Sequence, residues 1–325
     1  MTATVTLDDI TRAAEVITPH ICRTPLRLSP GLSADTGTTI LLKLETMQDT
    51  GAFKLRGATN KLLAMSEDER GRGVVAVSTG NHGRGVAFAA RRLDVRAVIC
   101  MSELVPAVKV EAIRAAGGEV IITGNSQDEA QETADRLIQD DGMVEVHPFD
   151  DPHVIAGQGT IGIELLREEP DLDTVVVPLS GGGLISGIAL AIKSQHPGTR
   201  VIGVSMERGP AMYECQKAGK PIPVEEMSSL ADSLGGGIGL NNAYTFAMVR
   251  DYVDDMVLVS EDQIAEAMAW LYWNDRIIAE GGGAVGVAAL LNGKIDKLGE
   301  KAALVVSGCN VDMAKFTDIA ARFAP

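Results

Sequence analysis

The sequence predicts an α/β protein built from two doubly wound domains with mostly parallel sheets. Short runs of β-branched residues alternate with segments of helical period over most of the 325 residues. This alternation is typical of parallel sheets that are covered by helices on both faces. The strand–helix units fall into two groups, one around residues 50–147 and one from residue 150 onward, with no linker rich in Pro, Gly or Ser between them. We therefore expect two closely packed domains with a cleft between them.

The positions of the strands and helices follow from the same pattern. The expected strands include Thr39–Leu44, Val74–Ser78, Arg96–Met101, Glu119–Thr123, Thr174–Pro178, Val201–Ser205, Met256–Val259 and Ala302–Ser307. The helices expected between them include Asn81–Arg92, Ala107–Ala116, Gln127–Asp140, His153–Arg167 and Glu261–Ile278. Ser260 precedes the last of these helices, and Gln263 three residues later completes the pattern of a capping box.

The composition excludes several classes of partner. The chain has 29 Lys and Arg against 44 Asp and Glu, a net charge of −15, and its basic residues are not clustered. Nucleic acid and anionic membrane surfaces are therefore poor candidates as partners. No apolar run approaches the length that spans a membrane, and the N-terminus does not resemble a signal peptide. The four cysteines include no CxxC pair, so we expect a cytoplasmic protein in a reducing compartment.

The segment Thr50–Gly57 contains one lysine, Lys54, between Phe53 and several small residues, where a polar loop enters a helix. An amine that forms Schiff bases needs a lowered pKa, because only the neutral amine is nucleophilic. Desolvation lowers the pKa of a lysine, and a nearby cation, here Arg56, would lower it further. Taken alone, Lys54 is also compatible with an ordinary solvated lysine on a helix surface.

The segment Ser78–Gly83 joins an expected strand to an expected helix. Hydroxyl groups and open backbone N–H groups at the N-terminus of a helix attract an anion such as a carboxylate. The amide of Asn81 adds a group that can reach a ring hydroxyl or a carbonyl. The same residue types also cap helices for purely structural reasons.

Two further segments follow expected strands. Consecutive glycines in Ser180–Gly187 let backbone N–H groups close around a phosphate, although the segment matches neither the P-loop nor the GxGxxG pattern. The segment Ser307–Asp312 places a hydroxyl at the carboxyl end of a strand, where open α/β sheets bind ligands. For a buried nitrogen heterocycle, Ser307 would be a neutral partner.

These segments together resemble the fold-type II pyridoxal-phosphate enzymes of the serine/threonine dehydratase and serine racemase family. The matching segments are Ala52–Ala58, Thr79–Gly83, His147–Asp151, Val154–Thr160, Gly181–Gly187 and Ser307–Asp312. The resemblance extends from about Ile10 to Val311, and the order of the segments is specific even though each glycine loop alone is not. It implies a tryptophan synthase β-subunit-like fold.

The resemblance implies a pyridoxal 5'-phosphate cofactor and a role for each matching residue. Lys54 would hold the cofactor as a Schiff base with Phe53 beside the ring, Asn81 would bind the phenolic oxygen, and Ser307 would face the pyridine nitrogen. The phosphate would be cradled by Gly181, Gly182, Gly183 and Leu184. The substrate carboxylate would be received by Ser78, Thr79, Gly80, Asn81 and His82. The large, cofactor-binding domain would comprise residues 1–47 and 148–325, and the small, substrate-side domain residues 48–147.

The resemblance also implies an ammonia-lyase (dehydratase) that eliminates water from a 3-hydroxy amino acid such as L-threonine or L-serine. The amine of Lys54 would take the Cα proton, and a 2-oxo acid and ammonia would be released. A neutral Ser307 makes the cofactor a weaker electron sink, which favours loss of the β-hydroxyl over transamination. The alternatives are dehydration of 3-hydroxyaspartate or of an amino acid from hydroxyectoine utilization, serine racemisation, and a non-catalytic amino-acid sensor on the same fold.

Two residues bear on these alternatives. Thr79 stands where the racemase has a serine that reprotonates the opposite face of the substrate, and its methyl group crowds that face, so racemisation would be a side activity. Arg136 falls near a position that binds a second carboxylate in some relatives, although its context favours a solvated helix arginine. The metal-ligand positions of related enzymes fall on Ser205 and Ala211, so no metal is expected. The resemblance implies a homodimer with a small-molecule amino acid as its substrate.

Overall fold

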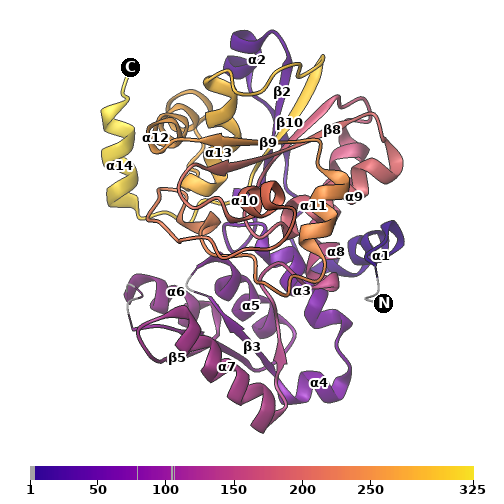
Figure 1. Cartoon of the computed structure of the whole chain (residues 1–325), viewed down its shortest axis with the longest axis vertical. Helices are drawn as coiled ribbons and strands as arrows, with labels where there is room; N and C mark the ends of the chain where they lie inside the picture. The colour runs from indigo at the N-terminus through magenta and orange to yellow at the C-terminus, as the bar shows by residue number, and fades with distance from the viewer. Residues whose placement is uncertain (1–3, 79, 104, 106) are drawn as a thin grey trace.

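Strands and helices alternate along the chain, and the strands form two separate sheets. The computed structural model describes residues 4–78, 80–103, 105 and 107–325. Figure 1 shows the larger sheet in the upper half of the molecule and the smaller sheet, with its own helices, in the lower half. The mixed α/β architecture and the mostly parallel strands confirm the predicted fold class.

The larger sheet has six strands in the order β1-β2-β10-β7-β8-β9. These strands are β1 (Leu26–Leu28), β2 (Thr39–Leu44), β7 (Thr174–Pro178), β8 (Arg200–Met206), β9 (Asp255–Val259) and β10 (Lys301–Val306). All neighbouring strands are parallel except β1 and β2, which are antiparallel. The central strands β10, β7 and β8 are buried almost throughout, as expected where helices cover both faces of a sheet.

The smaller sheet has four parallel strands in the order β5-β4-β3-β6. These strands are β3 (Val74–Val77), β4 (Ala97–Met101), β5 (Glu119–Ile122) and β6 (Val144–Glu145). All of them lie within residues 48–147, the segment expected to form the small domain, and all strands of the larger sheet lie outside it. The domain boundaries themselves stay a prediction.

Helices surround both sheets (Figure 1). The α-helices are α1 (Leu7–Ile17), α2 (Pro30–Thr36), α3 (Lys54–Ala64), α4 (Glu67–Arg72), α5 (Asn81–Arg92), α6 (Ala107–Ala116), α7 (Gln127–Asp141), α8 (Pro152–Glu168), α9 (Gly183–Gln195), α10 (Ala211–Ala218), α11 (Thr245–Tyr252), α12 (Glu261–Trp270), α13 (Gly281–Leu291) and α14 (Met313–Arg322). Within the described residues, none of the helices combines the length and the apolar character needed to span a membrane.

Every strand that the sequence predicts is present, with ends that differ from the prediction by at most one residue. The short strands β1 and β6 were not predicted, because three and two residues are too few to show a period of two. The capping box predicted at the start of α12 is formed. The side chains of Ser260 and Gln263 each accept a hydrogen bond from the backbone N–H of the other residue.

The prediction of one helix over residues 261–278 is wrong in its second half. A π-helical turn, Leu271–Asp275, follows α12, and Arg276 then adopts a left-handed conformation with φ 60°. The carboxylate of Asp275 is buried and accepts a hydrogen bond of 2.8 Å from the hydroxyl of Ser29. This contact with a distant part of the chain accompanies the end of the helix, although the apolar period of the sequence continues past it.

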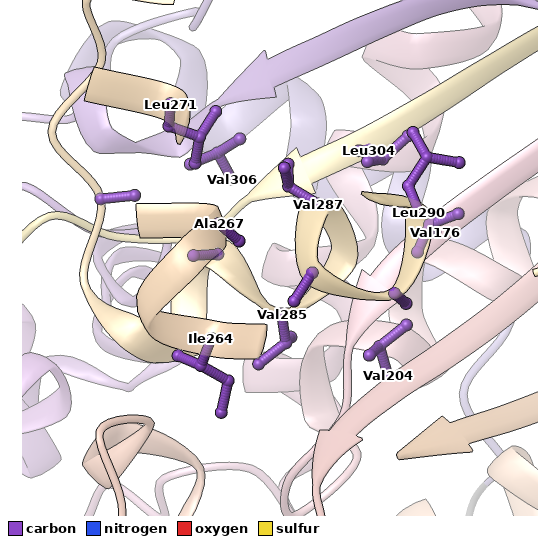
Figure 2. Packing of buried hydrophobic residues seen from close by; sticks show 14 of the residues in the cluster. Val176, Val204, Ile264, Ala267, Leu271, Val285, Val287, Leu290, Leu304 and Val306 are labelled. Atoms are coloured by element: carbon purple, nitrogen blue, oxygen red, sulfur yellow. The ribbon is translucent and has the colours of Figure 1, made fainter. Parts of the chain in front are cut away.

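The helix α13 lies at the centre of the larger core. Its residues Gly281–Leu290 are all buried, which agrees with a sequence that is apolar on every side. Figure 2 shows its side chains packed between the larger sheet and α12; the labelled contacts are Val176, Val204, Leu304 and Val306 of the sheet, Val285, Val287 and Leu290 of α13, and Ile264 and Ala267 of α12. Each fully buried Val, Leu or Ile contributes roughly 1.5–3 kcal/mol to the stability of this core.

The helices α3 and α8 make direct backbone contact. A Cβ atom at Gly157 would lie 2.7 Å from the Cα atom of Gly57, closer than any side chain allows. Glycine at this crossing therefore lets α3, which begins at Lys54, lie directly on α8. The start of α3 is fixed relative to the larger sheet as a result.

A buried ion cluster of Lys43, Glu45, Arg56 and Glu164 fastens the first turn of α3 to β2 and α8. Arg56 is fully buried and donates to the carboxylates of Glu45 and Glu164 at 2.7–2.9 Å. The amine of Lys43, also fully buried, lies 2.7 Å from Glu164. These two cations meet two carboxylates, and Glu168, 3.6 Å from Lys43, is itself paired with Arg23, so the charges balance.

Candidate active site

Lys54 is the first residue of α3, and its amine is partly buried where distant segments of the chain meet. Its Nζ atom donates a hydrogen bond of 2.6 Å to the carbonyl of Pro148 and lies 5.3 Å from the centre of the Phe53 ring. The backbone N–H of Phe53 donates to the carbonyl of Ser307 at 3.0 Å, which joins the end of β10 to the start of α3. The segments around Lys54, His147–Asp151 and Ser307, all identified from the sequence, therefore lie together.

The pKa of Lys54 is lowered to about 8, because burial disfavours the charged amine. The carboxylate of Glu280 acts in the opposite direction and offsets only part of this effect. The prediction that Arg56 lowers the pKa of Lys54 is wrong. The guanidinium of Arg56 is bound in the buried ion cluster, where the charges of Glu45 and Glu164 neutralise it.

Asn81 and His82 begin α5, whose first backbone N–H groups receive no cap from a side chain of the described residues. An open helix N-terminus of this kind attracts anions, which suits the predicted binding of a substrate carboxylate. The Nε2 atom of His82 lies 2.6 Å from the carbonyl of Val146, so this nitrogen carries the proton. Burial and the charge of Lys54 lower the pKa of His82 to about 3, and its ring is neutral.

The loop before α5 also contains the other predicted carboxylate-binding residues. The backbone N–H of Gly80 donates to the hydroxyl of Ser78 at 3.3 Å. Thr79, predicted to be both catalytic and substrate-binding, lies outside the described residues.

The predicted phosphate loop forms the start of α9. Gly182 has φ 91° and precedes the helix, Gly183 is its first residue, and Leu184 is buried in its first turn. A Cβ atom at Gly181 would overlap the ring of Phe149, and one at Gly183 would lie 2.8 Å from the carbonyl of Phe149. Among the residues that the structure describes, no side chain caps this helix. The loop therefore presents open backbone N–H groups, as a phosphate site requires.

The family model described as "Pyridoxal-phosphate dependent enzyme" matches residues 17–308. The chain belongs to this family. An L-threonine ammonia-lyase of Thermotoga maritima is 48% identical over 309 residues, which cover 95% of this chain and 76% of that protein.

Solved structures of family members have the same fold as this pyridoxal-phosphate-dependent enzyme. Maize serine racemase superimposes with a TM-score of 0.92 at 34% identity and covers 98% of both chains. The processed form of threonine deaminase isoform 2 from Solanum lycopersicum gives a TM-score of 0.90 at 34% identity, over 99% of this chain and 96% of that one. The predicted fold-type II architecture is confirmed.

The residues present fit the cofactor of the family. Lys54 supplies an amine with a lowered pKa, and the glycine loop, which packs against Phe149 with no room for a side chain at Gly181 or Gly183, supplies backbone N–H groups for a phosphate. Ser307 is buried at the end of β10, and its hydroxyl makes no hydrogen bond within the described part of the chain. A hydroxyl that is free of other partners can donate a hydrogen bond to a ring nitrogen without transferring its proton. The individual roles of these residues stay predictions.

Glu280 is a buried carboxylate beside Asn81 that the sequence alone did not identify. Its Oε1 accepts from the side chain of Asn81 at 2.7 Å, and its Oε2 accepts from the backbone N–H of Asn310 at 2.9 Å. Burial raises the pKa of Glu280 to about 7, although hydrogen bonds to the carboxylate oppose this shift. In the sequence, Glu280 is marked only by the three glycines, Gly281–Gly283, that follow it. The structure shows why the first is a glycine, since a side chain on Gly281 would overlap the backbone of Leu230.

Arg136, the predicted ligand of a second substrate carboxylate, is exposed on α7. Its Nη2 donates to the hydroxyl of Thr133 at 2.8 Å, so its guanidinium is held on its own helix. Within the described residues, no hydrogen bond or ion pair joins it to Lys54 or Asn81. Its role in substrate binding stays a prediction.

Proposed function

We propose that the chain is a pyridoxal-phosphate-dependent ammonia-lyase that eliminates water from a 3-hydroxy amino acid such as L-threonine or L-serine. The observation that carries this proposal is the partly buried amine of Lys54, with a pKa of about 8. It is hydrogen-bonded to Pro148, whose neighbour Phe149 packs on the Gly181–Gly183 loop, and Lys54 follows Phe53, which is hydrogen-bonded to Ser307. The relative from Thermotoga maritima is named an L-threonine ammonia-lyase, and the tomato structure is a threonine deaminase. Both names support this activity.

The chemistry divides between the cofactor and the protein. When bound, pyridoxal phosphate supplies an electron sink for the electron pair left at the substrate Cα. With a pKa of about 8, a useful fraction of Lys54 is neutral near neutral pH and accepts the Cα proton. The open N–H groups at the start of α5 hold the substrate carboxylate. Ser307 would face the ring nitrogen without protonating it, which favours departure of the β-hydroxyl with a proton as water. Hydrolysis of the resulting enamine would then give a 2-oxo acid and ammonia.

Serine racemisation is the second candidate, because the maize serine racemase structure superimposes with a TM-score of 0.92. It requires a proton donor on the face opposite Lys54, the position that Thr79 is predicted to occupy. A 3-hydroxyaspartate substrate has less support, since Arg136 binds to its own helix. The proposed assembly is a homodimer.

Activity assays on the purified protein test the proposal. The candidate substrates are L-threonine, L-serine, both 3-hydroxyaspartate diastereomers and amino acids derived from hydroxyectoine. We expect a yellow protein that releases 2-oxo acid fastest from L-threonine or L-serine. Lys54→Ala should lose the visible absorbance and lower the rate by about 10³-fold or more, because it removes the general base. Lys217→Ala, at an exposed lysine of α10, is the matched control and should keep both properties.

The possible results separate the alternatives. Formation of D-serine faster than release of pyruvate would identify a racemase instead. A protein that binds amino acids without turning any over would identify a sensor. A colourless protein that does not take up pyridoxal phosphate would contradict the proposal.

A further inference from the structure

The side-chain amide of Asn310 is held in one orientation by its neighbours. Its Nδ2 donates to the backbone carbonyl of Thr50 at 2.8 Å, and its Oδ1 accepts from Nη1 of Arg84 at 2.6 Å. A carbonyl only accepts hydrogen bonds and a guanidinium only donates them. Exchange of the oxygen and nitrogen atoms of Asn310 would therefore break both contacts, so the assignment of these atoms is determined by chemistry.

The orientation of Asn310 in turn determines that of Asn81. The second N–H of Asn310 Nδ2 donates to Oδ1 of Asn81 at 2.7 Å. Nδ2 of Asn81 donates to Oε1 of Glu280 at 2.7 Å, and the other carboxylate oxygen of Glu280 accepts the backbone N–H of Asn310. These bonds form a closed ring of three residues. One N–H of Asn81 remains without an acceptor within the described part of the chain.

We propose that Asn310 and Glu280 are positioning residues that hold the Asn81 amide so that its remaining N–H donates to the ring oxygen of the bound cofactor. This inference rests on the proposed function and on the predicted contact between Asn81 and that oxygen. A reversed Asn81 amide would turn its own oxygen toward the carboxylate of Glu280 and toward the cofactor oxygen, which are both acceptors. The ring of hydrogen bonds excludes that orientation before the cofactor binds.

The ring also joins the two halves of the molecule. Asn81 and Arg84 belong to α5, which packs on the smaller sheet, whereas Glu280 and Asn310 precede α13 and follow β10 in the larger one. A donor at the ring oxygen stabilises its anionic form, since hydrogen bonds to charged groups are stronger than those between neutral groups. The ionisation of that oxygen determines the visible absorbance of the bound cofactor. The spectrum therefore reports on the Asn81 amide directly.

The sharpest test is Asn310→Asp, which keeps the shape of the side chain but replaces the Nδ2 donor with a carboxylate oxygen. The new oxygen should attract the N–H groups of Asn81 and reverse its amide. We expect a shifted visible band in the holoenzyme and a cofactor Kd raised by about tenfold or more, as for loss of one hydrogen bond to a charged group. The matched control is Asn292→Asp, at an exposed asparagine after α13 that also donates to a carboxylate, and it should leave both quantities unchanged.

A double-mutant cycle separates positioning from a general structural role. If Asn310 acts through Asn81, Asn310→Asp should change neither the band nor the Kd further once Asn81→Ala is present. An equal effect of Asn310→Asp in both backgrounds, or no effect in the wild-type background, would overturn the inference. If Asn310→Asp does not fold, Glu280→Gln replaces it in the test. Glu280→Gln should shift the visible band in the same direction by a smaller amount. An unchanged band would likewise count against the inference.

The two proposals fail in different ways. A wild-type protein with the visible band whose Asn310→Asp variant is unchanged refutes only the positioning role. A wild-type protein that acquires no visible band with pyridoxal phosphate refutes both.

Discussion

Two cations, the partly buried Lys54 and the fully buried Arg56, stand two residues apart at the start of α3 and have opposite properties. Burial alone would lower the pKa of Arg56, but the charges and hydrogen bonds of Glu45 and Glu164 outweigh burial and raise it. In the described part of the chain no carboxylate is bound to the amine of Lys54, and burial lowers its pKa to about 8. The presence of a bound counter-ion, rather than burial itself, separates the structural cation from the reactive one.

Two carboxylates, the partly buried Glu164 and the buried Glu280, show the same contrast. Burial raises the pKa of Glu164, but Arg56 and Lys43 reverse that effect and lower it. Within the described residues Glu280 forms no ion pair; it accepts from the side-chain amide of Asn81 and the backbone N–H of Asn310, and burial raises its pKa to about 7. The ion cluster around Arg56 pairs its charges and fastens α3 to β2 and α8. The site around Lys54 and Glu280 instead keeps groups whose pKa values lie near neutral pH.

The largest effect on stability is expected from Arg56→Met. This change leaves Glu45 and Glu164 buried without their main counter-ion, and removal of one partner from a buried ion pair costs about 3–5 kcal/mol. Lys54→Ala removes a cation that forms no ion pair with the described residues, so we expect it to leave the free energy of unfolding nearly unchanged. Urea denaturation of both variants measures the difference.

A further variant keeps this experiment informative if Arg56→Met is insoluble. Arg56→Lys retains the charge but loses the two-pronged contact with Glu45, so it should be destabilised by less than Arg56→Met. Equal stability of wild type and Arg56→Met would show that the buried ion cluster does not secure the start of α3.

The contrast between Lys54 and Arg56 also marks how far the sequence could predict the site. The strands follow from their apolar runs, and the Lys54, Asn81, glycine-loop and Ser307 segments follow from residue types at strand ends. Arg56 was misinterpreted, because the sequence does not say which way a side chain turns. Glu280 was missed since its partner Asn81 is 199 positions away. Contacts between distant residues decide such details, and no local pattern contains them.

The second prediction concerns the pH dependence of stability in the cofactor-free protein. In the folded state the pKa of Glu280 is about 7, above its ordinary value of 4.5. Its contribution to stability is therefore fully present below pH 4.5 and is lost as the pH rises through 7. His82 behaves in the opposite way: its folded pKa is about 3 against an ordinary 6.5, so its contribution is present above pH 6.5 and is lost as the pH falls through 3.

Glu280→Gln removes one of these opposing contributions. Between pH 4.5 and 7 the stability of the variant should rise with pH more steeply than that of wild type, by up to about 1.4 kcal/mol per pH unit for one proton. Urea denaturation across this range measures both slopes. Glu266→Gln, at an exposed position of α12, is the control and should follow the wild-type slope. Parallel curves for wild type and Glu280→Gln would mean that Glu280 does not hold a proton in the folded state at these pH values.

The smallest effect on stability is expected from Arg96→Met. Arg96 and Glu119 form an ion pair with the same two-pronged geometry as Arg56 and Glu45, but on the surface of the protein. Arg96 contacts both carboxylate oxygens of Glu119 through Nε and Nη2, at 2.9–3.2 Å. Arg56 contacts Glu45 through the same two nitrogens at 2.8 Å. The side chains of Arg96 and Glu119 are 49% and 56% exposed, so water and salt screen their attraction.

Because the same substitution is made at both arginines, the two variants isolate the effect of burial. An exposed pair contributes less than about 1 kcal/mol, and Arg96→Met should lower the free energy of unfolding by no more than that. Added salt should reduce even this loss, whereas the loss in Arg56→Met should hardly respond to salt. A loss in Arg96→Met as large as that in Arg56→Met would mean that two-pronged geometry alone, and not burial, determines the strength of these pairs. The contrast between a paired structural cation and an unpaired reactive one would then need another cause.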